Sequence, residues 1–476
     1  CTPFERRLWL LDQTINDRGI AVDVDLARAA LRAADRSAVD LARRSDELTE
    51  GGVKSTTQRD VLKQYIDTEH GVEMADLTKG TVADMLKKDD IDPDLRELLT
   101  IRQQASATSP AKYRTLLKGV SADGRLRGTL QFCGAMRTGR WGGRLFQPQN
   151  LPRPTLKRAA IEAGIAAMKL DCEDLVFGNV MELCASAVRG SLVASPGKKL
   201  VISDLSNIEG RVAAWIAGED WKLEAFKAYD KSKSELDDIY VRAYAKAFGV
   251  TPEQVIDNKK HGDGMMRQLG KIMELALGFG GSIGAFSTMA KLYGVELPEE
   301  EILRIVKAWR KAHLNIVAYW YDLESAVRWA MNFPGERSKL RDIEIDVVDG
   351  WLRVRLPSGR YLCYPNVGKN DDNEIVYDGV NQYTRKWERI KTYGGKLFEN
   401  IVQATARDVL AHGMIKAEET GYPVCLHVHD ELITEVPDDV SYAVADLSRM
   451  MGSTLPWSMG LPLAAAGFET HRYRKD

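Results

Sequence analysis

Two acidic residues stand five positions apart where strand-like sequence gives way to helix-like sequence. Asp204 ends the strand-like run 199–204, and Glu209 follows Ser206 and Asn207, which are residue types that often cap the start of a helix. An acid at a strand end beside a helix start is well placed to hold a hard cation. Taken alone, Asp204 could equally be a helix N-cap, so this segment leaves both interpretations open.

A second polar cluster interrupts two β-rich runs near the carboxy-terminal end. His429, Asp430 and Glu431 are consecutive ionisable residues between the apolar runs 424–428 and 432–436. Charged groups inside apolar strand sequence are costly unless they are paired or bound to a metal. We therefore expect a bend that presents the three side chains together at a sheet edge, and metal binding is favoured over a merely solvated cluster.

A third segment combines two cations with two apolar groups at helical spacing. Arg267, Lys271, Leu275 and Phe279 follow one another every four residues and would line one face of a helix. Cations at the start of a helix oppose its macrodipole, so they favour an anion such as a triphosphate in front of them. An ordinary basic helix remains the alternative. The glycines that follow do not have the spacing of a P-loop.

The composition sets the class of protein that must position these residues. The chain has 476 residues, 44% hydrophobic and 28% charged, which excludes a disordered chain and a small disulfide scaffold. With 66 basic and 68 acidic residues the net charge is -2, so any basic surface for nucleic acid must be local. Six scattered cysteines indicate a reducing compartment, and we expect a cytoplasmic location; no apolar run is long enough to span a membrane.

The hydrophobic periodicity predicts helical lobes around a small sheet. We expect an amphipathic helix and short strand within 1–30, a helical region over 25–117, a strand at 199–204 and helices from 208 to 333. A hairpin around 357–359, a helix at 394–420, a strand pair at 424–436 and a final helix and strand follow. This order predicts an α+β fold with a mostly antiparallel sheet.

In this order the segments resemble the family A DNA polymerases, the group of bacterial DNA polymerase I and its bacteriophage relatives. Residues 204–211 are similar to motif A of that family, 267–280 to motif B and 429–431 to motif C. Residues 138–152 and 403–408 resemble the family's segments at the primer terminus and the minor groove. Residues 393–400 and 461–470 look more like phage-borne members of the family than cellular ones. This resemblance implies a role in phage genome replication.

The resemblance implies a role for each matching residue. The catalytic and metal-binding candidates are Asp204, Leu205 through its carbonyl, Asp430, Glu431 and Lys271. The candidates for binding a deoxynucleoside triphosphate are Arg267, Lys271, Glu209, Tyr240, Leu275, Phe279 and Asn207. The candidates for binding DNA are Arg140, Gln149, Asn150, Gln403, His429, Lys54, Arg102, Lys112 and Arg114. Leu275, Phe279 and Tyr240 depart from the aromatic residue, the Tyr and the His that are usual in the family.

The resemblance also implies the architecture and the partners. We expect a right-hand fold with a palm-associated helix and strand at 1–30, a thumb at 31–118, palm at 119–220, fingers at 221–385 and palm again at 386–476. The implied reaction is primer extension by two-metal phosphoryl transfer with Mg²⁺, or alternatively Mn²⁺. Primer-template DNA and dNTP are the implied partners, processivity or replisome proteins are candidates, and a monomer without membrane contact and without a proofreading exonuclease in this chain is expected.

The sequence leaves three alternatives open. A single-subunit RNA polymerase shares the right-hand palm, although Glu209 and Glu431 speak against it. A catalytically inactive DNA-binding protein could keep the same fold, but Asp204, Asp430 and Lys271 are all present. A metal-dependent nuclease would use similar acids and would degrade the primer without added dNTP.

Overall fold

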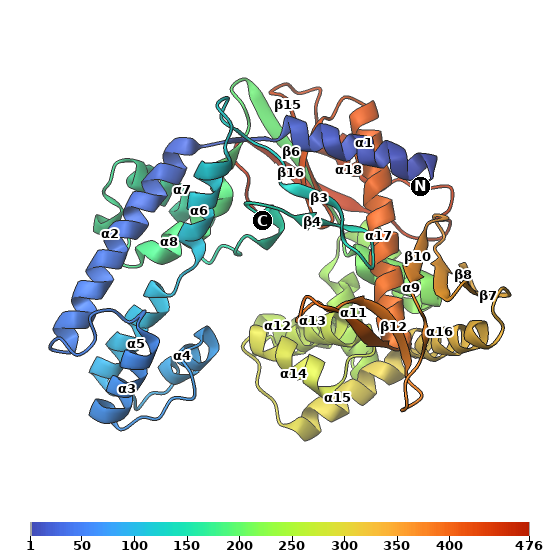
Figure 1. Cartoon of the computed structure of the whole chain (residues 1–476), viewed down its shortest axis with the longest axis horizontal. Helices are drawn as coiled ribbons and strands as arrows, with labels where there is room; N and C mark the ends of the chain where they lie inside the picture. The colour runs from blue at the N-terminus through green and yellow to red at the C-terminus, as the bar shows by residue number, and fades with distance from the viewer. Residues whose placement is uncertain (1, 476) are drawn as a thin grey trace.

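The computed structural model describes residues 2–475 and is built around a four-stranded antiparallel sheet. The strand order is β14-β15-β6-β16, so the two acidic segments of the sequence lie on neighbouring strands. A long helix, α17, and the shorter α9 and α18 pack around this sheet (Figure 1). These elements are β6 (Lys198–Leu205), α9 (Ile208–Ala217), α17 (Gly394–Glu419), β14 (Val424–Val428), β15 (Glu431–Pro437), α18 (Val444–Met451) and β16 (Ala465–Thr470).

The expected α+β class and the elements around the sheet are confirmed. Strand β6 is buried on both faces, which explains its continuous apolar sequence between Leu200 and Ile202. Helix α17 is buried over most of its length and carries the predicted segment 403–408. The sheet therefore forms the centre of the main hydrophobic core.

A helical lobe near the amino terminus lies at one end of this central region (Figure 1). One face of its first helix is rich in buried alanine, which lets α6, α7 and α8 approach it closely. The tip of the lobe has a separate core that includes Leu62, Ile66 and Leu99. Its helices are α2 (Val24–Leu48), α3 (Arg59–His70), α4 (Lys79–Leu86), α5 (Pro93–Ala105) and α6 (Ser109–Gly119).

The amino-terminal helix and several short strands join this lobe to the central sheet. The small sheet β2-β1-β5 is antiparallel, and helix α1 contacts β14, β3 and α17. The expected helix and strand within the first 30 residues are thus confirmed. The elements are α1 (Pro3–Arg18), β1 (Ile20–Val22), β2 (Arg125–Leu126), β3 (Leu130–Ala135), β4 (Arg140–Gly143), α7 (Arg158–Lys169), α8 (Val180–Ala187) and β5 (Leu192–Val193).

A second helical lobe faces the first across the opening of an arch (Figure 1). Its helix α13 carries the predicted cations. Glu274 of this helix forms a buried ion pair with Lys222, and His313 Nε2 lies 2.9 Å from Glu274 Oε1. The helices are α10 (Asp220–Ser232), α11 (Ile239–Phe248), α12 (Pro252–His261), α13 (Met265–Leu277), α14 (Ile283–Leu292), α15 (Glu299–Ala312) and α16 (Leu314–Asn332).

The part of the chain that connects α16 to α17 forms two further antiparallel sheets. The expected hairpin around 357–359 is confirmed as β9 and β10, whereas most of the other strands were not predicted. The strands are β7 (Arg337–Leu340), β8 (Ile343–Val348), β9 (Trp351–Arg355), β10 (Tyr361–Tyr364), β11 (Gly368–Lys369), β12 (Ile375–Val380) and β13 (Trp387–Thr392). Within residues 2–475, no helix is both long and apolar enough to cross a membrane.

Candidate active site

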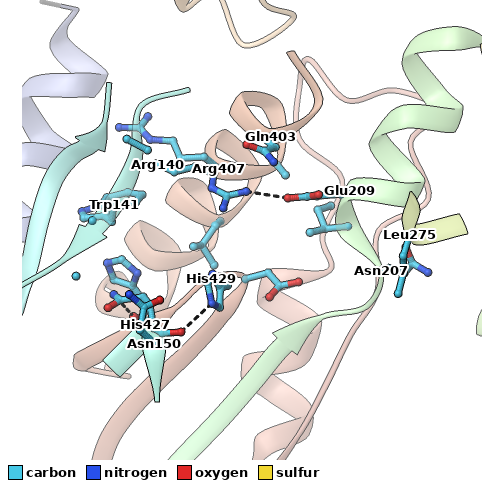
Figure 2. Close-up of a pocket in the computed structure, with 18 of the residues that line it drawn as sticks. Arg140, Trp141, Asn150, Asn207, Glu209, Leu275, Gln403, Arg407, His427 and His429 are labelled. Atoms are coloured by element: carbon cyan, nitrogen blue, oxygen red, sulfur yellow. Dashed lines mark hydrogen bonds and ion pairs between the residues drawn. The ribbon is translucent and has the colours of Figure 1, made fainter. Parts of the chain in front are cut away.

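A cavity of about 580 Å³ lies where the central sheet, β4, α9, α13 and α17 meet. Figure 2 shows side chains from these separate elements pointing into one space. The predicted site residues that line it are Arg140, Gln149, Asn150, Asn207, Glu209, Tyr240, Leu275, Gln403, His429 and Asp430. Residues that are distant in the sequence are therefore brought together as expected.

Strand pairing places the two principal acids side by side. Asp204 is the register partner of Glu431 on β15, and the Leu205 N–H donates a 3.1 Å hydrogen bond to the Asp430 carbonyl. The bend before β15 is tight because His429 adopts a left-handed conformation with φ of 57°. Its ring Nε2 lies 3.2 Å from the Gln149 carbonyl oxygen, which ties the bend to the segment after β4.

The neighbouring carboxyl groups of Asp204 and Asp430 favour a bound cation, because each is harder to ionise beside the other. Burial, together with the charge of Asp430, raises the pKa of Asp204 to about 7, and burial raises the pKa of Asp430. The Lys475 ammonium lies 3.8 Å from Asp204 Oδ2 and partly offsets this charge. Two carboxylates that are desolvated and adjacent are the oxygen donors that Mg²⁺ prefers.

The carboxylates fit a divalent metal ion, although they do not form a complete cage. Within the described part of the chain, no group of three or more His, Cys, Asp or Glu side chains is arranged to hold a metal ion. The neighbouring acid Glu431 is instead bound by Tyr473, whose hydroxyl donates a 2.7 Å hydrogen bond to Glu431 Oε1. Magnesium keeps several water or substrate ligands and commonly uses only one or two carboxylates, so this donor set is sufficient.

The predicted cations of helix α13 do not line this cavity, and each contacts other residues of the second helical lobe. Arg267 forms a 2.6 Å ion pair with Asp238, and its guanidinium lies 5.6 Å from the centre of the Tyr240 ring. The Lys271 ammonium lies 4.6 Å from the centre of the Tyr293 ring. Leu275 is 43% exposed and borders the cavity, so an apolar surface follows the two cations as expected.

The expectation that Phe279 continues the helix face of Arg267, Lys271 and Leu275 is wrong. Helix α13 ends at Leu277, because Gly278 is followed by Gly280, which has a positive φ of 81°, and by Gly281. The Phe279 ring therefore lies in the turn after the helix and packs near Phe398 of α17, with ring centres 5.9 Å apart. The aromatic group joins α13 to α17 and does not extend the helix face.

An ion pair links β4 to the start of α9. Arg140 Nη1 lies 2.8 Å from Glu209 Oε1, as Figure 2 shows. Burial raises the pKa of Glu209, while the pairing with Arg140 acts in the opposite direction. The Glu209 carboxylate is thus fixed at the rim of the cavity, in the first turn of α9.

Several residues that line or support the cavity were not predicted from the sequence. Trp141, Arg407 and His427 line it, and the buried Arg407 is held by Glu5 and by the Gly139 carbonyl. Arg407 follows Gln403 by four residues on α17, and this helical spacing was a usable signal. Trp141 and His427 gave no local signal, because their role depends on the packing of β4 against β14.

Comparison with known proteins identifies the family. The chain is 37% identical to a DNA polymerase of Bacillus phage SP02 over 482 residues, covering 99% of this chain and 71% of that protein. This chain belongs to the family A DNA polymerases. The thermostable DNA polymerase I of Thermus thermophilus is 25% identical over 282 residues, which cover 58% of this polymerase and 27% of the Thermus protein.

A solved structure supports the right-hand fold of this polymerase. The POL domain of Pol1 from M. smegmatis, in complex with DNA primer-template and dNTP, matches with a TM-score of 0.65 and 19% identity. The match covers 99% of this chain and 69% of that chain. No family model matches the sequence. The polymerase is therefore an α+β enzyme with a small antiparallel palm sheet and helical lobes on either side.

The cations of the amino-terminal lobe that were predicted to bind DNA differ in their burial and in their hydrogen-bond partners. Arg102 is 4% exposed, and its guanidinium donates to the carbonyls of Thr56 and Leu77. The expectation that Arg102 contacts DNA is therefore wrong, because this side chain connects buried segments of the lobe. Lys112 donates a 2.8 Å hydrogen bond to the Phe146 carbonyl.

Two other predicted DNA contacts in this lobe lie on its surface. Arg114 forms a 2.8 Å ion pair with Asp35, and both side chains are exposed. Lys54 is exposed in the loop before α3. Both cations are accessible to a phosphate backbone, and an exposed ion pair such as that of Arg114 costs little to exchange for a phosphate.

The polymerase should be more stable without the Asp204 charge when no metal is bound. The pKa of Asp204 is raised from 3.8 to about 7, so the folded state keeps a proton that the unfolded chain loses at lower pH. Above about pH 7 the folded state therefore carries the full cost of the charged pair. We expect Asp204→Asn to stabilise the metal-free protein by about 1 kcal/mol at about pH 8, a value discounted for solvent screening of a partly exposed side chain.

Thermal unfolding in the presence of a chelator measures this effect. Near about pH 3, below both the ordinary pKa of 3.8 and the raised one, the Asp204 carboxyl is largely protonated in both states, so the variant and the wild type should have similar Tm values. A variant that is less stable than the wild type at the higher pH would show that Asp204 is compensated in the metal-free protein.

Proposed function

We propose that this polymerase adds deoxynucleotides to a primer 3'-hydroxyl on a DNA template, with release of pyrophosphate. The observation that carries the proposal is the placement of Asp204 near the end of β6 and of Asp430 in the turn that leads into the paired strand β15, beside a cavity that Glu209 and Leu275 also line. We further propose that it serves phage genome replication in the cytoplasm of the infected host cell. The similarity to a DNA polymerase of Bacillus phage SP02 supports this role.

Asp204, Asp430 and the Leu205 carbonyl would hold two divalent metal ions, Mg²⁺ or alternatively Mn²⁺. When bound, these ions would neutralise the charge that develops on the transferred phosphoryl group. The protein's own part is to hold two carboxylates at adjacent strand ends, where the backbone ladder fixes their separation. Glu431 would stabilise this arrangement through its hydrogen bond with Tyr473.

Residues of the second helical lobe would bind and orient the triphosphate. Arg267 and Lys271 supply two positive charges one helical turn apart, and Tyr240 lies beside Arg267. Lys271 would also donate a proton to the leaving pyrophosphate. Asn207, Leu275 and Phe279 would shape the space for the sugar and the base.

The DNA would lie across the sheet, between the two lobes of the arch. Arg140, Gln149, Asn150, Gln403 and His429 line the cavity and would contact the primer terminus and the minor groove. The minor groove offers acceptors that are shared by all correct base pairs, so these contacts would test geometry without reading sequence. We propose Lys54, Lys112 and Arg114 as phosphate contacts, with 31–118 as thumb, 221–385 as fingers and the remaining segments, including 1–30, 119–220 and 386–476, as palm.

Primer extension with dNTP or NTP on a primed template tests this function directly. Extension with dNTP alone supports a DNA polymerase, extension with NTP supports an RNA polymerase, and primer loss without any nucleotide indicates a nuclease. The chain is proposed to act as a monomer on primer-template DNA, with replisome proteins as candidate partners.

Glu209 should determine the choice between deoxyribose and ribose. Its carboxylate is fixed at the cavity rim by Arg140, where it would exclude a 2'-hydroxyl. We expect Glu209→Ala to lower the ratio of kcat/KM for dNTP over NTP by about 10- to 100-fold, the usual range for removal of one such contact. Single-nucleotide incorporation kinetics measure the ratio.

Glu209→Gln is the matched control for this experiment, because it keeps the size of the side chain and removes the charge. It should retain most of the discrimination if the exclusion is steric. An unchanged ratio in Glu209→Ala would remove Glu209 from the sugar pocket.

A further inference from the structure

The last described residues, 471–475, return to the central part of the molecule. The Ala194 N–H donates a 2.9 Å hydrogen bond to the His471 carbonyl, and the Tyr473 N–H donates a 2.9 Å bond to the Leu192 carbonyl. The segment therefore pairs with the edge of β5. Figure 1 places the carboxy-terminal end on the inner side of the arch, between the two lobes.

Three side chains of this segment make contacts that hold it in place. The Arg472 guanidinium lies 2.8 Å from Asp23, and the Arg474 guanidinium lies 4.3 Å from the centre of the Phe468 ring. Tyr473 is 1% exposed and accepts a 3.2 Å hydrogen bond from Arg189. The backbone that leads to Lys475 is consequently fixed.

This anchoring brings two residues of one segment onto the two acidic motifs. The Tyr473 hydroxyl binds Glu431, and the Lys475 ammonium lies 3.8 Å from Asp204 Oδ2. The Lys475 side chain is 28% exposed and the Asp204 side chain 37%, so both are partly shielded from solvent. A cation thus faces a carboxylate that has been proposed to bind metal.

We propose that Lys475 is a resident counter-cation of the metal site, which competes with a divalent ion for Asp204. The proposal rests on the proposed function, in which Asp204 is a metal ligand. An ammonium on a flexible stem can partly offset the charge of the carboxylate pair when no metal is present and move away when a doubly charged ion enters. Lys475 therefore sets the metal concentration at which the site fills.

Removal of this charge should strengthen metal binding. We expect Lys475→Gln to bind Mn²⁺ about threefold more tightly than the wild type, since a partly exposed ion pair makes only a modest contribution to binding. The binding is measured on the full chain without DNA, by electron paramagnetic resonance of free Mn²⁺. The Mg²⁺ concentration for half-maximal primer extension should fall by a similar factor.

Two control variants separate the local charge from a general one. Lys475→Arg keeps the charge and should bind Mn²⁺ like the wild type. Arg474→Gln removes one positive charge at the neighbouring position, where the guanidinium packs over Phe468, and should change Mn²⁺ affinity less than Lys475→Gln does. Equal effects of Lys475→Gln and Arg474→Gln, or unchanged or weaker binding in Lys475→Gln, would overturn the proposal.

A third variant distinguishes this failure from failure of the proposed function. Asp204→Asn should lose most of the Mn²⁺ binding. If it does, but Lys475→Gln binds Mn²⁺ like the wild type, only the role of Lys475 is wrong. If Asp204→Asn binds Mn²⁺ normally, the metal site itself is assigned to the wrong residues.

Discussion

Replacement of Asp430 by Asn should abolish primer extension while leaving DNA binding intact. The substitution keeps the shape of the side chain and removes one of two adjacent carboxylates at the end of the paired strands. Metal ions contribute several kcal/mol to the stabilisation of a phosphoryl-transfer transition state, so the rate should fall by about 10³-fold or more. Single-turnover extension measures the rate, and fluorescence anisotropy with labelled primer-template measures binding.

The control for this experiment is an acid that has no part in the site. Asp446 pairs with Arg449 on the exposed surface of α18, and Asp446→Asn makes the same chemical change there. This variant should extend primers at a normal rate. Near-normal extension by Asp430→Asn would remove Asp430 from the catalytic centre, whereas loss of both extension and DNA binding would indicate a structural defect.

Replacement of Lys271 by Ala should have the second-largest effect. This residue lies in the middle of α13, where its ammonium is near the Tyr293 ring and one turn from Arg267. The variant loses both a positive charge at the triphosphate and the proposed proton donor to pyrophosphate. General acid catalysis contributes about 10²- to 10⁴-fold, and we expect the rate of nucleotide incorporation to fall within this range.

Pre-steady-state kinetics can separate the two contributions of Lys271. The maximal incorporation rate should fall more than the affinity for dNTP, and Lys271→Arg should restore affinity better than rate. Lys291→Ala, on the exposed end of α14, is the matched control and should behave like the wild type. A change in dNTP affinity alone would leave Lys271 as a binding residue and not as a proton donor.

The order of elements and the identity of the motifs could be predicted from local sequence. The apolar run before Asp204 formed β6, the runs around Asp430 formed β14 and β15, and the periodicity of 394–420 formed α17. These predictions succeeded because the period of the apolar residues is a property of a few neighbouring positions. The matches to three family motifs then indicated which elements must meet.

Other features of the site could not be predicted, because they depend on contacts between distant segments. Arg102 looked like a surface cation, but the packing of the amino-terminal lobe buries it against two carbonyls. Phe279 continued the helical spacing, but the glycines around it ended α13 and turned the ring toward Phe398. In both cases tertiary packing overrode the local pattern.

The sequence by itself determined the secondary structure around the motifs, the family and the residue types available for chemistry. Only the tertiary structure decided that Glu209 is fixed by Arg140, that Glu431 is bound by Tyr473, and that Lys475 faces Asp204. The physical reason is that helices and strands form from local periodicity, whereas the charge balance of a site depends on which strand ends and chain ends the fold brings together.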